Sequence, residues 1–495
     1  METSEQKHLP QARVVVPHPY LALMGLYLGG FAGMYSETAL NIALPQLSAA
    51  FGVDLALTQW LVVGYMLVIG IVLPFTSLLA KWFSARKITL FALGAFLVGS
   101  VVSGLAPSFE ICLVGRAIQG IGTGLVLPLM FSMVMEVIPP HKIGSAMGVN
   151  ALVIMSASAI GPTLAGILVG ALSWRAIFFS FAVVLLVGIA FTLKFSVSPY
   201  ELTKPKIDGL SVLASCLGFG GIVLGAGISS LYGWASVPTI AALVIGIVAL
   251  VVYVKRQLGM DVPVIDMRVF KQRGFTIGAL CVMLNFGITL AIMFVLPQFY
   301  QNAMALPVSM AGLVLLPGGI VNAVVSALAG RVYDRVGARI PGMIGFGLSV
   351  AGSVALLFAT PATPLAYVMA CHITLMVGVP LAMSPCQTYA LASLPHELST
   401  DGSTMLNTMQ QVLGAVCTAL ATFLLAAGQG AYLGAGGADV AEAFAQGSHL
   451  VFSFALVLAV VSLVLASRIK AQRSSATVAA VAKVESQGEA SANAY

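Results

Sequence analysis

Two ionisable side chains stand out because they lie well inside long apolar stretches of the chain. Glu37 is the only carboxylate placed this deeply, and Arg116 is the only basic side chain comparably embedded. A charged group at membrane depth costs about 2.5–3.5 kcal/mol on insertion scales, so it usually has a partner and a function. One buried acid and one buried base are suited to moving protons, a solute, or both.

Proton coupling requires a carboxyl group whose protonation can change. A nearby arginine favours the ionised form of Glu37, whereas removal from water favours the protonated form. Along their own stretches, Glu37 and Arg116 lie at depths that differ by only about 3 Å, at 1.5 Å per residue. Gln119, one turn from Arg116, can hydrogen-bond either side chain or a substrate. A static pair that only fixes helix packing is the alternative, and both interpretations stay open.

The composition predicts a polytopic membrane protein. Hydrophobic residues make up 59% of the chain and charged residues 8%, with a mean hydropathy of +1.02. A soluble chain of 495 residues needs a far more polar surface. The six cysteines lack the spacing of a metal or redox site, so core thiols are expected rather than disulfides. No cleavable signal peptide is expected, because the first apolar stretch is full-length.

The apolar segments predict fourteen transmembrane helices, each of the roughly 20 residues that cross a bilayer. Of the 23 Lys and Arg residues, 21 fall in the tails, in the even-numbered loops or at span ends next to those loops, and Arg116 and Arg175 are the exceptions. The excess of basic residues predicts that both termini are cytoplasmic. The expected location is the plasma (inner) membrane. The placement of these basic residues also explains the net charge of +6, so no nucleic-acid partner is expected. The predicted spans are 20–44, 57–80, 87–106, 110–135, 143–170, 175–194, 208–230, 237–254, 274–297, 308–329, 340–359, 363–386, 402–427 and 448–467.

An internal repeat divides the chain into halves. The sequence LPQL at 44–47 returns as LPQF at 296–299, and SLLAKWFSAR at 77–86 corresponds to GRVYDRVGAR at 330–339. Two related six-helix bundles around a central site are typical of alternating-access transporters. The predicted regions are a cytoplasmic tail (1–18), an N-terminal six-helix bundle (19–200), two inserted transmembrane helices with flanking loops (201–273), a C-terminal six-helix bundle (274–469) and a disordered cytoplasmic tail (470–495), with 427–447 as an outer loop.

These motifs and three others, in the expected order, resemble the fourteen-span drug:proton antiporter branch (EmrB/QacA-like) of the major facilitator superfamily. The others are TALNIALP at 38–45, RAIQGIGTG at 116–124 and GPTLAG at 161–166, the last followed by Trp174 and Arg175. Together they cover nearly the whole chain. The resemblance implies an all-α major facilitator fold with two six-helix bundles plus two inserted helices.

Two departures from this branch resemble its LmrB-like lincomycin-resistance subgroup. The branch usually carries Asp at the position of Ser36, which Glu37 follows here. In the thirteenth span the branch usually carries Arg after an Asn, whereas here that Arg is replaced and the sequence continues from Asn407 to Gln410 and Gln411. One position is about 100° around a helix. The coupling role of that Asp is expected to pass to Glu37.

Two further motifs have conformational interpretations. Gly161 and Pro162 predict a kink in the fifth span, and Gly166 permits close helix approach; the resemblance implies an antiporter motif and export, and an ordinary transmembrane proline is the alternative. The loop after the tenth span predicts a cytoplasmic latch in which an acid accepts from arginines or a helix N-terminus. Solvated charges that only set topology are the alternative interpretation. The latch residues are Gly330, Arg331, Asp334, Arg335, Gly337 and Arg339.

The substrate cavity is the least determined feature. An adaptable apolar cavity built from some of the 25 Phe and 21 Met would suit bulky lipophilic or cationic solutes. A histidine in the twelfth span is either a proton carrier or a polar core residue. The candidate polar residues are Trp60, Tyr65, Asn285, Gln298, His372, Asn407, Gln410 and Gln411.

We therefore expect a proton-coupled antiporter that exports drugs or other lipophilic or cationic small molecules by alternating access. A dedicated exporter or importer of one metabolite or lipid, with the same fold, is the alternative. An enzyme is not expected, because no Asp-rich or His-rich cluster and no P-loop occurs. No cofactor or metal is expected, because the proton gradient is expected to drive transport. Expected partners are small-molecule substrates, protons and the lipid bilayer, with a periplasmic adaptor if the cell has two membranes.

Overall fold

The computed structural model describes residues 18–138, 143–197, 208–260, 266–395 and 398–470. These residues form fourteen long helices, a short helix α2 (Leu55–Thr58), a 3₁₀ turn η2 (Met267–Lys271) and a π turn η3 (Phe299–Ala303), and they contain no strand. The all-α prediction is confirmed. The long helices are α1 (Pro19–Phe51), α3 (Trp60–Trp82), α4 (Ala85–Gly104), α5 (Phe109–Val137), α6 (Ile143–Ala171), α7 (Arg175–Phe195), α8 (Gly209–Tyr232), α9 (Val237–Gly259), α10 (Arg273–Gln298), α11 (Val308–Val336), α12 (Arg339–Leu356), α13 (Leu365–Ala392), α14 (Ser399–Gly434) and α15 (Val440–Ser467).

Thirteen segments of the described residues are long and apolar enough to cross a membrane. The first helix is not among them, because Glu37 and several glycines lower its mean hydropathy. Its 33 residues still span about 50 Å at 1.5 Å per residue, which exceeds the hydrocarbon core. The side of the bundle on which α1 begins and α15 ends is called the terminal side.

Several predicted boundaries were wrong. The tenth span was expected to end at 329 with a loop after it, but α11 continues to Val336. The first span was expected to close at Leu44, but α1 continues through Pro45 to Phe51. Neighbouring helices can satisfy the carbonyl that a proline leaves free inside a transmembrane helix. Residues 427–447 were expected to form a loop, but α14 extends to Gly434 and α15 begins at Val440. The many alanines in this segment favour helix.

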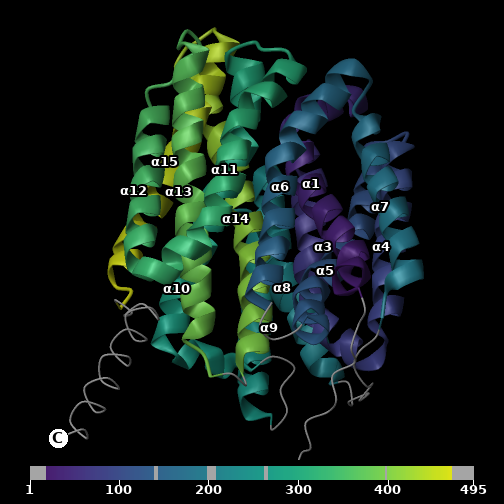
Figure 1. The fold of residues 1–495 in the computed structure, drawn as a ribbon. Helices are drawn as coiled ribbons and strands as arrows, with labels where there is room; N and C mark the ends of the chain where they lie inside the picture. The colour runs from purple at the N-terminus through teal and green to yellow at the C-terminus, as the bar shows by residue number, and fades with distance from the viewer. Residues whose placement is uncertain (1–17, 139–142, 198–207, 261–265, 396–397, 471–495) are drawn as a thin grey trace, which may run out of the picture.

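The helices separate into two groups with the inserted pair between them (Figure 1). Helices α1–α7, drawn in purple and blue, lie on one side, and α10–α15, drawn from teal through green to yellow, lie on the other. The inserted helix α8 packs against α3 of the first half and α14 of the second. It also packs closely on α9, because a Cβ on Gly221 would lie 2.7 Å from the Cα of Gly246. The predicted arrangement of two bundles and two inserted helices matches this packing.

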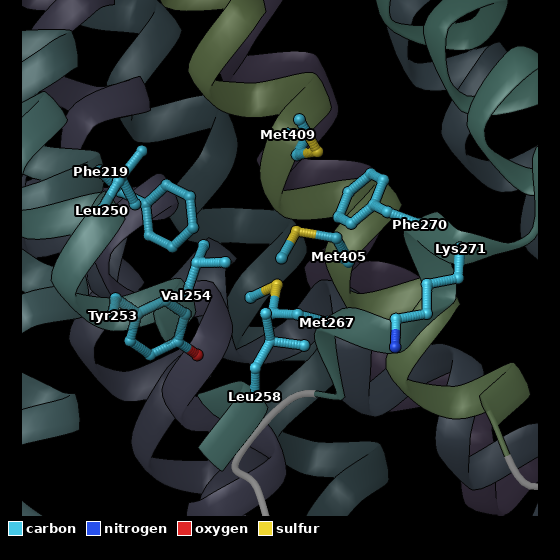
Figure 2. Close-up of a pocket in the computed structure, with 10 residues that line it drawn as sticks. All are labelled: Phe219, Leu250, Tyr253, Val254, Leu258, Met267, Phe270, Lys271, Met405 and Met409. Atoms are coloured by element: carbon cyan, nitrogen blue, oxygen red, sulfur yellow. The ribbon is translucent and has the colours of Figure 1, made fainter. Parts of the chain in front are cut away.

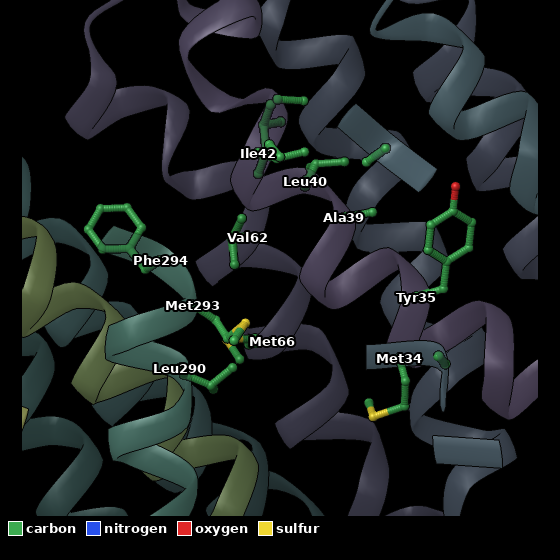
Figure 3. Packing of buried hydrophobic residues seen from close by; sticks show 14 of the residues in the cluster. Met34, Tyr35, Ala39, Leu40, Ile42, Val62, Met66, Leu290, Met293 and Phe294 are labelled. Atoms are coloured by element: carbon green, nitrogen blue, oxygen red, sulfur yellow. The ribbon is translucent and has the colours of Figure 1, made fainter. Parts of the chain in front are cut away.

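The two halves are in direct contact through α6 and α11. A Cβ on Gly166 would lie 3.0 Å from the Cα of Gly312, and the Thr163 hydroxyl donates to the Gly312 carbonyl at 2.9 Å. A buried apolar cluster also continues across the interface and includes Met66 of α3 and Met293 of α10 (Figure 3). The halves therefore form one packed body, and side chains between them are removed from water.

Candidate functional site

Arg116 is fully buried in the N-terminal half and holds several elements together. Its Nε donates to the Leu61 carbonyl at 2.7 Å, and its Nη1 donates to Ser36 Oγ at 2.5 Å and to Gln119 Oε1 at 2.7 Å. The guanidinium lies 3.9 Å from the centre of the Tyr65 ring, in a cation–π contact. Charged donors make the stronger hydrogen bonds, so this cluster fixes α1, α3 and α5 against one another.

The cluster extends away from the interface between the halves. Gln119 accepts from Arg116 and donates through Nε2 to Ser100 Oγ of α4 at 2.8 Å. The Tyr65 hydroxyl contacts Thr123 Oγ1 at 2.7 Å and donates to the Gly33 carbonyl at 3.0 Å. Gln119 and Tyr65 are therefore held in the N-terminal half. Neither side chain is free to move toward a substrate without breaking these hydrogen bonds.

Glu37 lies next to this cluster but is not part of it. Its side chain is only 2% exposed, and its Oε2 atom has no hydrogen-bond partner among the described residues. The charge of Arg116 acts on the carboxylate, but no nitrogen of Arg116 comes within 4.0 Å of a carboxylate oxygen in the described structure. Gln411 of α14, in the other half, lies close enough to act on the carboxylate as well.

The consecutive residues Ser36 and Glu37 thus face different halves. The Ser36 hydroxyl accepts from Arg116 within the N-terminal half, whereas Glu37 contacts Gln411 of the C-terminal half. The 100° step between neighbouring residues on a helix explains the difference. An acid at position 36 would meet Arg116 directly, and moving it to position 37 places the carboxylate between the halves.

Helix α6 connects this site to the contact between the halves. Gly161 lies against Thr38 of α1, beside Glu37, and a side chain at this position would overlap the Thr38 hydroxyl. Pro162 is buried inside α6, and its carbonyl would lie 2.9 Å from a Cβ on Gly312. Gly166 makes the backbone contact with α11. One helix therefore packs against the neighbourhood of the carboxylate and against the opposite half.

The other predicted cavity residues are dispersed. Trp60 packs against Gly227 of α8, and Asn285 donates to the Val379 carbonyl at 2.8 Å inside the C-terminal half. Gln298 is fully buried and donates to the Phe294 carbonyl at 2.8 Å. These three side chains support helix packing in the described structure and do not meet Glu37.

The remaining cavity candidates lie on α13 and α14. His372 is 1% exposed, packs against Gly318 of α11, and has no hydrogen-bond partner at either ring nitrogen among the described residues. Asn407 donates to the Ser403 carbonyl of its own helix at 3.0 Å. Gln410 and Gln411 are buried, and Gln410 Nε2 has no described partner. Of these residues, Gln411 is the one that the structure brings to Glu37.

The predicted latch lies at the terminal side, where α11 ends and α12 begins. Gly330, Arg331, Arg335 and Arg339 are exposed, and Gly337 adopts a φ of +72° at the end of α11. The Asp334 side chain lies outside the described residues, so the acid of the latch has no described contacts. The latch remains a prediction.

The structure adds contacts that sequence analysis missed. Gln46 Nε2 donates to Gln301 Oε1 at 2.9 Å, and Gln301 Nε2 donates to the Ile42 carbonyl at 3.1 Å. Both glutamines lie on the side opposite the termini, one in each half. Gln46 belongs to the repeated LPQ motif, but nothing in that motif indicates its partner, which lies 255 residues away.

A chain of two related helical bundles with a buried carboxylate between them belongs to the class of membrane transporters, not enzymes. The family model for the Major Facilitator Superfamily matches residues 26–419, and the chain belongs to this superfamily.

Similar proteins agree with this assignment. The chain is 40% identical over 453 residues to the lincomycin resistance protein LmrB of Bacillus subtilis, covering 89% of this chain and 94% of that protein. It is 27% identical over 414 residues to the multidrug export protein EmrB of Haemophilus influenzae, covering 82% and 80%. Its fold is similar to a crystal structure of the peptide transporter POT in complex with sulfate, with a TM-score of 0.64, 16% identity, and coverage of 90% of this chain and 94% of that chain.

Proposed function

We propose that this protein is a proton-coupled antiporter that exports lipophilic or cationic drugs by alternating access. The observation that carries the proposal is the position of Glu37. Its carboxylate is buried between the halves, one oxygen lacks a described partner, and Gln411 of the opposite half lies beside it. The ionisation of a carboxyl group at this place depends on the contact between the halves.

Protonation of Glu37 is proposed to change the interactions that its carboxyl group makes at the interface between the halves. The ionised carboxylate is attracted by Arg116 and accepts from Gln411, whereas the protonated form loses the attraction and gains a donor. One proton crossing 100 mV supplies about 2.3 kcal/mol, and one pH unit adds about 1.4 kcal/mol. Together they can sustain a substrate gradient of roughly a few hundredfold.

The orientation is part of the proposal. The basic loops support a cytoplasmic terminal side in the plasma membrane. The Gln46–Gln301 and Thr163–Gly312 hydrogen bonds then join the halves on the extracellular side. In this conformation the extracellular exit is held closed, and export requires these contacts to break.

The substrate class is supported by the relatives. Two LmrB proteins, of Bacillus subtilis and of Listeria monocytogenes, are named for lincomycin resistance, at 40% and 38% identity. We propose lincomycin and other lipophilic or cationic drugs as substrates here, with no cofactor, and a periplasmic adaptor as a partner in a cell with two membranes. Competition by several unrelated cations in a counterflow assay supports a multidrug exporter, and strict selectivity indicates a dedicated transporter.

The test is drug transport by purified protein in liposomes with an imposed pH gradient. Glu37→Gln should abolish uphill accumulation of lincomycin or of a dye such as ethidium, while counterflow without a gradient continues. Glu136→Gln, at an exposed carboxylate of α5, is the matched control and should behave as wild type. Uphill transport by Glu37→Gln at the wild-type rate would remove Glu37 from the mechanism.

A further inference from the structure

An apolar pocket of about 360 Å³ lies near the terminal side, between the inserted pair and the C-terminal half. Its walls come from α8, α9, η2 and α14, and they include Phe219, Val254, Met267, Met405 and Met409 (Figure 2). The volume is at the lower end of the range of about 300–1,000 Å³ for small-ligand sites. Its position is separate from Glu37 and from the antiporter motif.

Two polar groups accompany this apolar lining. Tyr253 is 1% exposed and lines the pocket, and its hydroxyl has no hydrogen-bond partner among the described residues. Figure 2 shows this hydroxyl directed toward the space between α9 and η2. A buried hydroxyl without a partner is costly, by about 1–3 kcal/mol. A ligand atom that accepts or donates a hydrogen bond would remove that cost.

The second polar group is Lys271, the one charged residue among those that line the pocket. Its side chain is exposed, and among the described residues it has no carboxylate within 4.0 Å. The neighbouring Arg256 differs, because Asp208 holds it through two hydrogen bonds of 2.6 and 2.8 Å. Arg256 and a hydrogen bond from Ser211 keep the pKa of Asp208 well below its usual range. Arg256 is therefore already neutralised, whereas Lys271 is available to an anion.

We propose that this pocket binds an anionic phospholipid from the cytoplasmic leaflet, with the headgroup phosphate on Lys271, an ester oxygen accepting from the Tyr253 hydroxyl, and the first part of one acyl chain against the apolar lining. The pocket opens at the depth where the proposed orientation places that leaflet, since Tyr253 lies six residues, about 9 Å, before the end of α9. Basic pockets between transmembrane helices on the cytoplasmic side are suited to anionic headgroups. The flexible methionines adapt to an acyl chain.

The bound lipid would act on the transport site through α14. Met405 and Met409 line the pocket, and the next residues on the same helix are Gln410 and Gln411, which faces Glu37. An acyl chain bound between α9 and α14 would fix the position of α14. The inference rests on the proposed orientation, but its binding test does not depend on proton coupling or on drug export.

The test is native mass spectrometry of the purified full-length protein with phosphatidylglycerol and with phosphatidylethanolamine of the same acyl chains. Wild type should retain phosphatidylglycerol preferentially. Lys271→Gln should lower that preference about fivefold, the effect expected for one cation at a membrane surface. Lys255→Gln, at an exposed lysine of α9 outside the pocket, should not.

A second pair of variants tests the apolar part. Val254→Phe fills the pocket and should remove the retained lipid, whereas Val252→Phe, on the 42% exposed face of the same helix, should leave it bound. Equal retention by all four variants would overturn the proposal. Competitive displacement of phosphatidylglycerol by lincomycin would also overturn it, because the pocket would then belong to the drug pathway. Failure of drug transport with normal lipid retention would count against the proposed function alone.

Discussion

At the scale of single residues, Arg116 depends on the shape of its guanidinium as well as on its charge. Two of its nitrogens donate in different directions, one to Leu61 and one to Ser36 and Gln119. A lysine has one nitrogen and cannot reach all three acceptors. We expect Arg116→Lys to destabilise the protein by about 2–4 kcal/mol, because buried charged hydrogen bonds are lost and the Leu61 carbonyl is left without its donor.

The measurement is thermal unfolding of the purified protein, alongside drug transport. Arg175→Lys is the matched control, because Arg175 is exposed and makes a single described hydrogen bond, of 3.1 Å, to the Ala106 carbonyl. Equal stability of both variants and wild type would show that the Arg116 contacts contribute little.

A second prediction concerns positions 36 and 37. The double variant Ser36→Asp, Glu37→Gln places the only acid against Arg116, as in the usual pattern of the branch, and takes it away from Gln411. We expect it to recover less than about a tenth of wild-type uphill transport, because the acid would then lie within the N-terminal half, away from Gln411, and Arg116 would stabilise its ionised form. Full recovery in the liposome assay would show that contact with the opposite half is unnecessary.

Glu37 and Arg116 could be singled out as candidates from the sequence, because ionisable groups are conspicuous in apolar helices. The sequence could not establish that they point to different partners. That outcome depends on which side of α1 faces α14, and this rotation is set by contacts such as Gly161 on Thr38. Asn285 and Trp60 show the same limit, because a polar residue in a helix can serve packing as well as a cavity.

At the scale of helices, the α6–α11 crossing is the contact most sensitive to side-chain size. A Cβ on Gly166 would lie 2.9 Å from the Val308 carbonyl oxygen and 3.0 Å from the Gly312 Cα. Both are backbone atoms, which cannot move aside as a flexible side chain can. Gly166→Leu should therefore separate the two helices and lower transport by at least about tenfold. Gly94→Leu is the control, because nothing lies within 4 Å of a Cβ there. Comparable transport by the two variants at equal expression would contradict this role.

The helices themselves were predictable to a large extent. Fourteen apolar segments of about 20 residues leave little choice of secondary structure in a bilayer. Boundaries were less predictable at Pro45 and at Gly434, because a proline or a glycine lowers the expectation of helix while neighbouring helices can stabilise it. The pairing of α8 with α3 and α14 could not be predicted, since lipid and protein present similar apolar surroundings to a helix.

At the scale of the whole molecule, the halves are related by sequence but joined by unrelated residues. The repeat places Gln46 and Gln298 at corresponding positions, yet the partner of Gln46 is Gln301. Gln298 instead donates within its own helix. Gln46 and Gln301 belong to different bundles and do not occupy corresponding positions of the repeat. The hydrogen bond between them can therefore break without disturbing the packing inside either bundle. Alternating access requires such contacts, which hold one conformation and add little to the folding of each half.

The contact between Gln46 and Gln301 gives a direct test of this view. A Gln46→Cys, Gln301→Cys pair, in a protein whose six native cysteines are replaced, should be linked by a short bifunctional thiol reagent, because the two native side chains lie 2.9 Å apart. The link should lower transport by at least about tenfold by holding the extracellular side closed, and cleavage of a disulfide in the reagent should restore it. Each single cysteine variant serves as the control. Full transport by the linked protein would show that export proceeds without separation of these two residues.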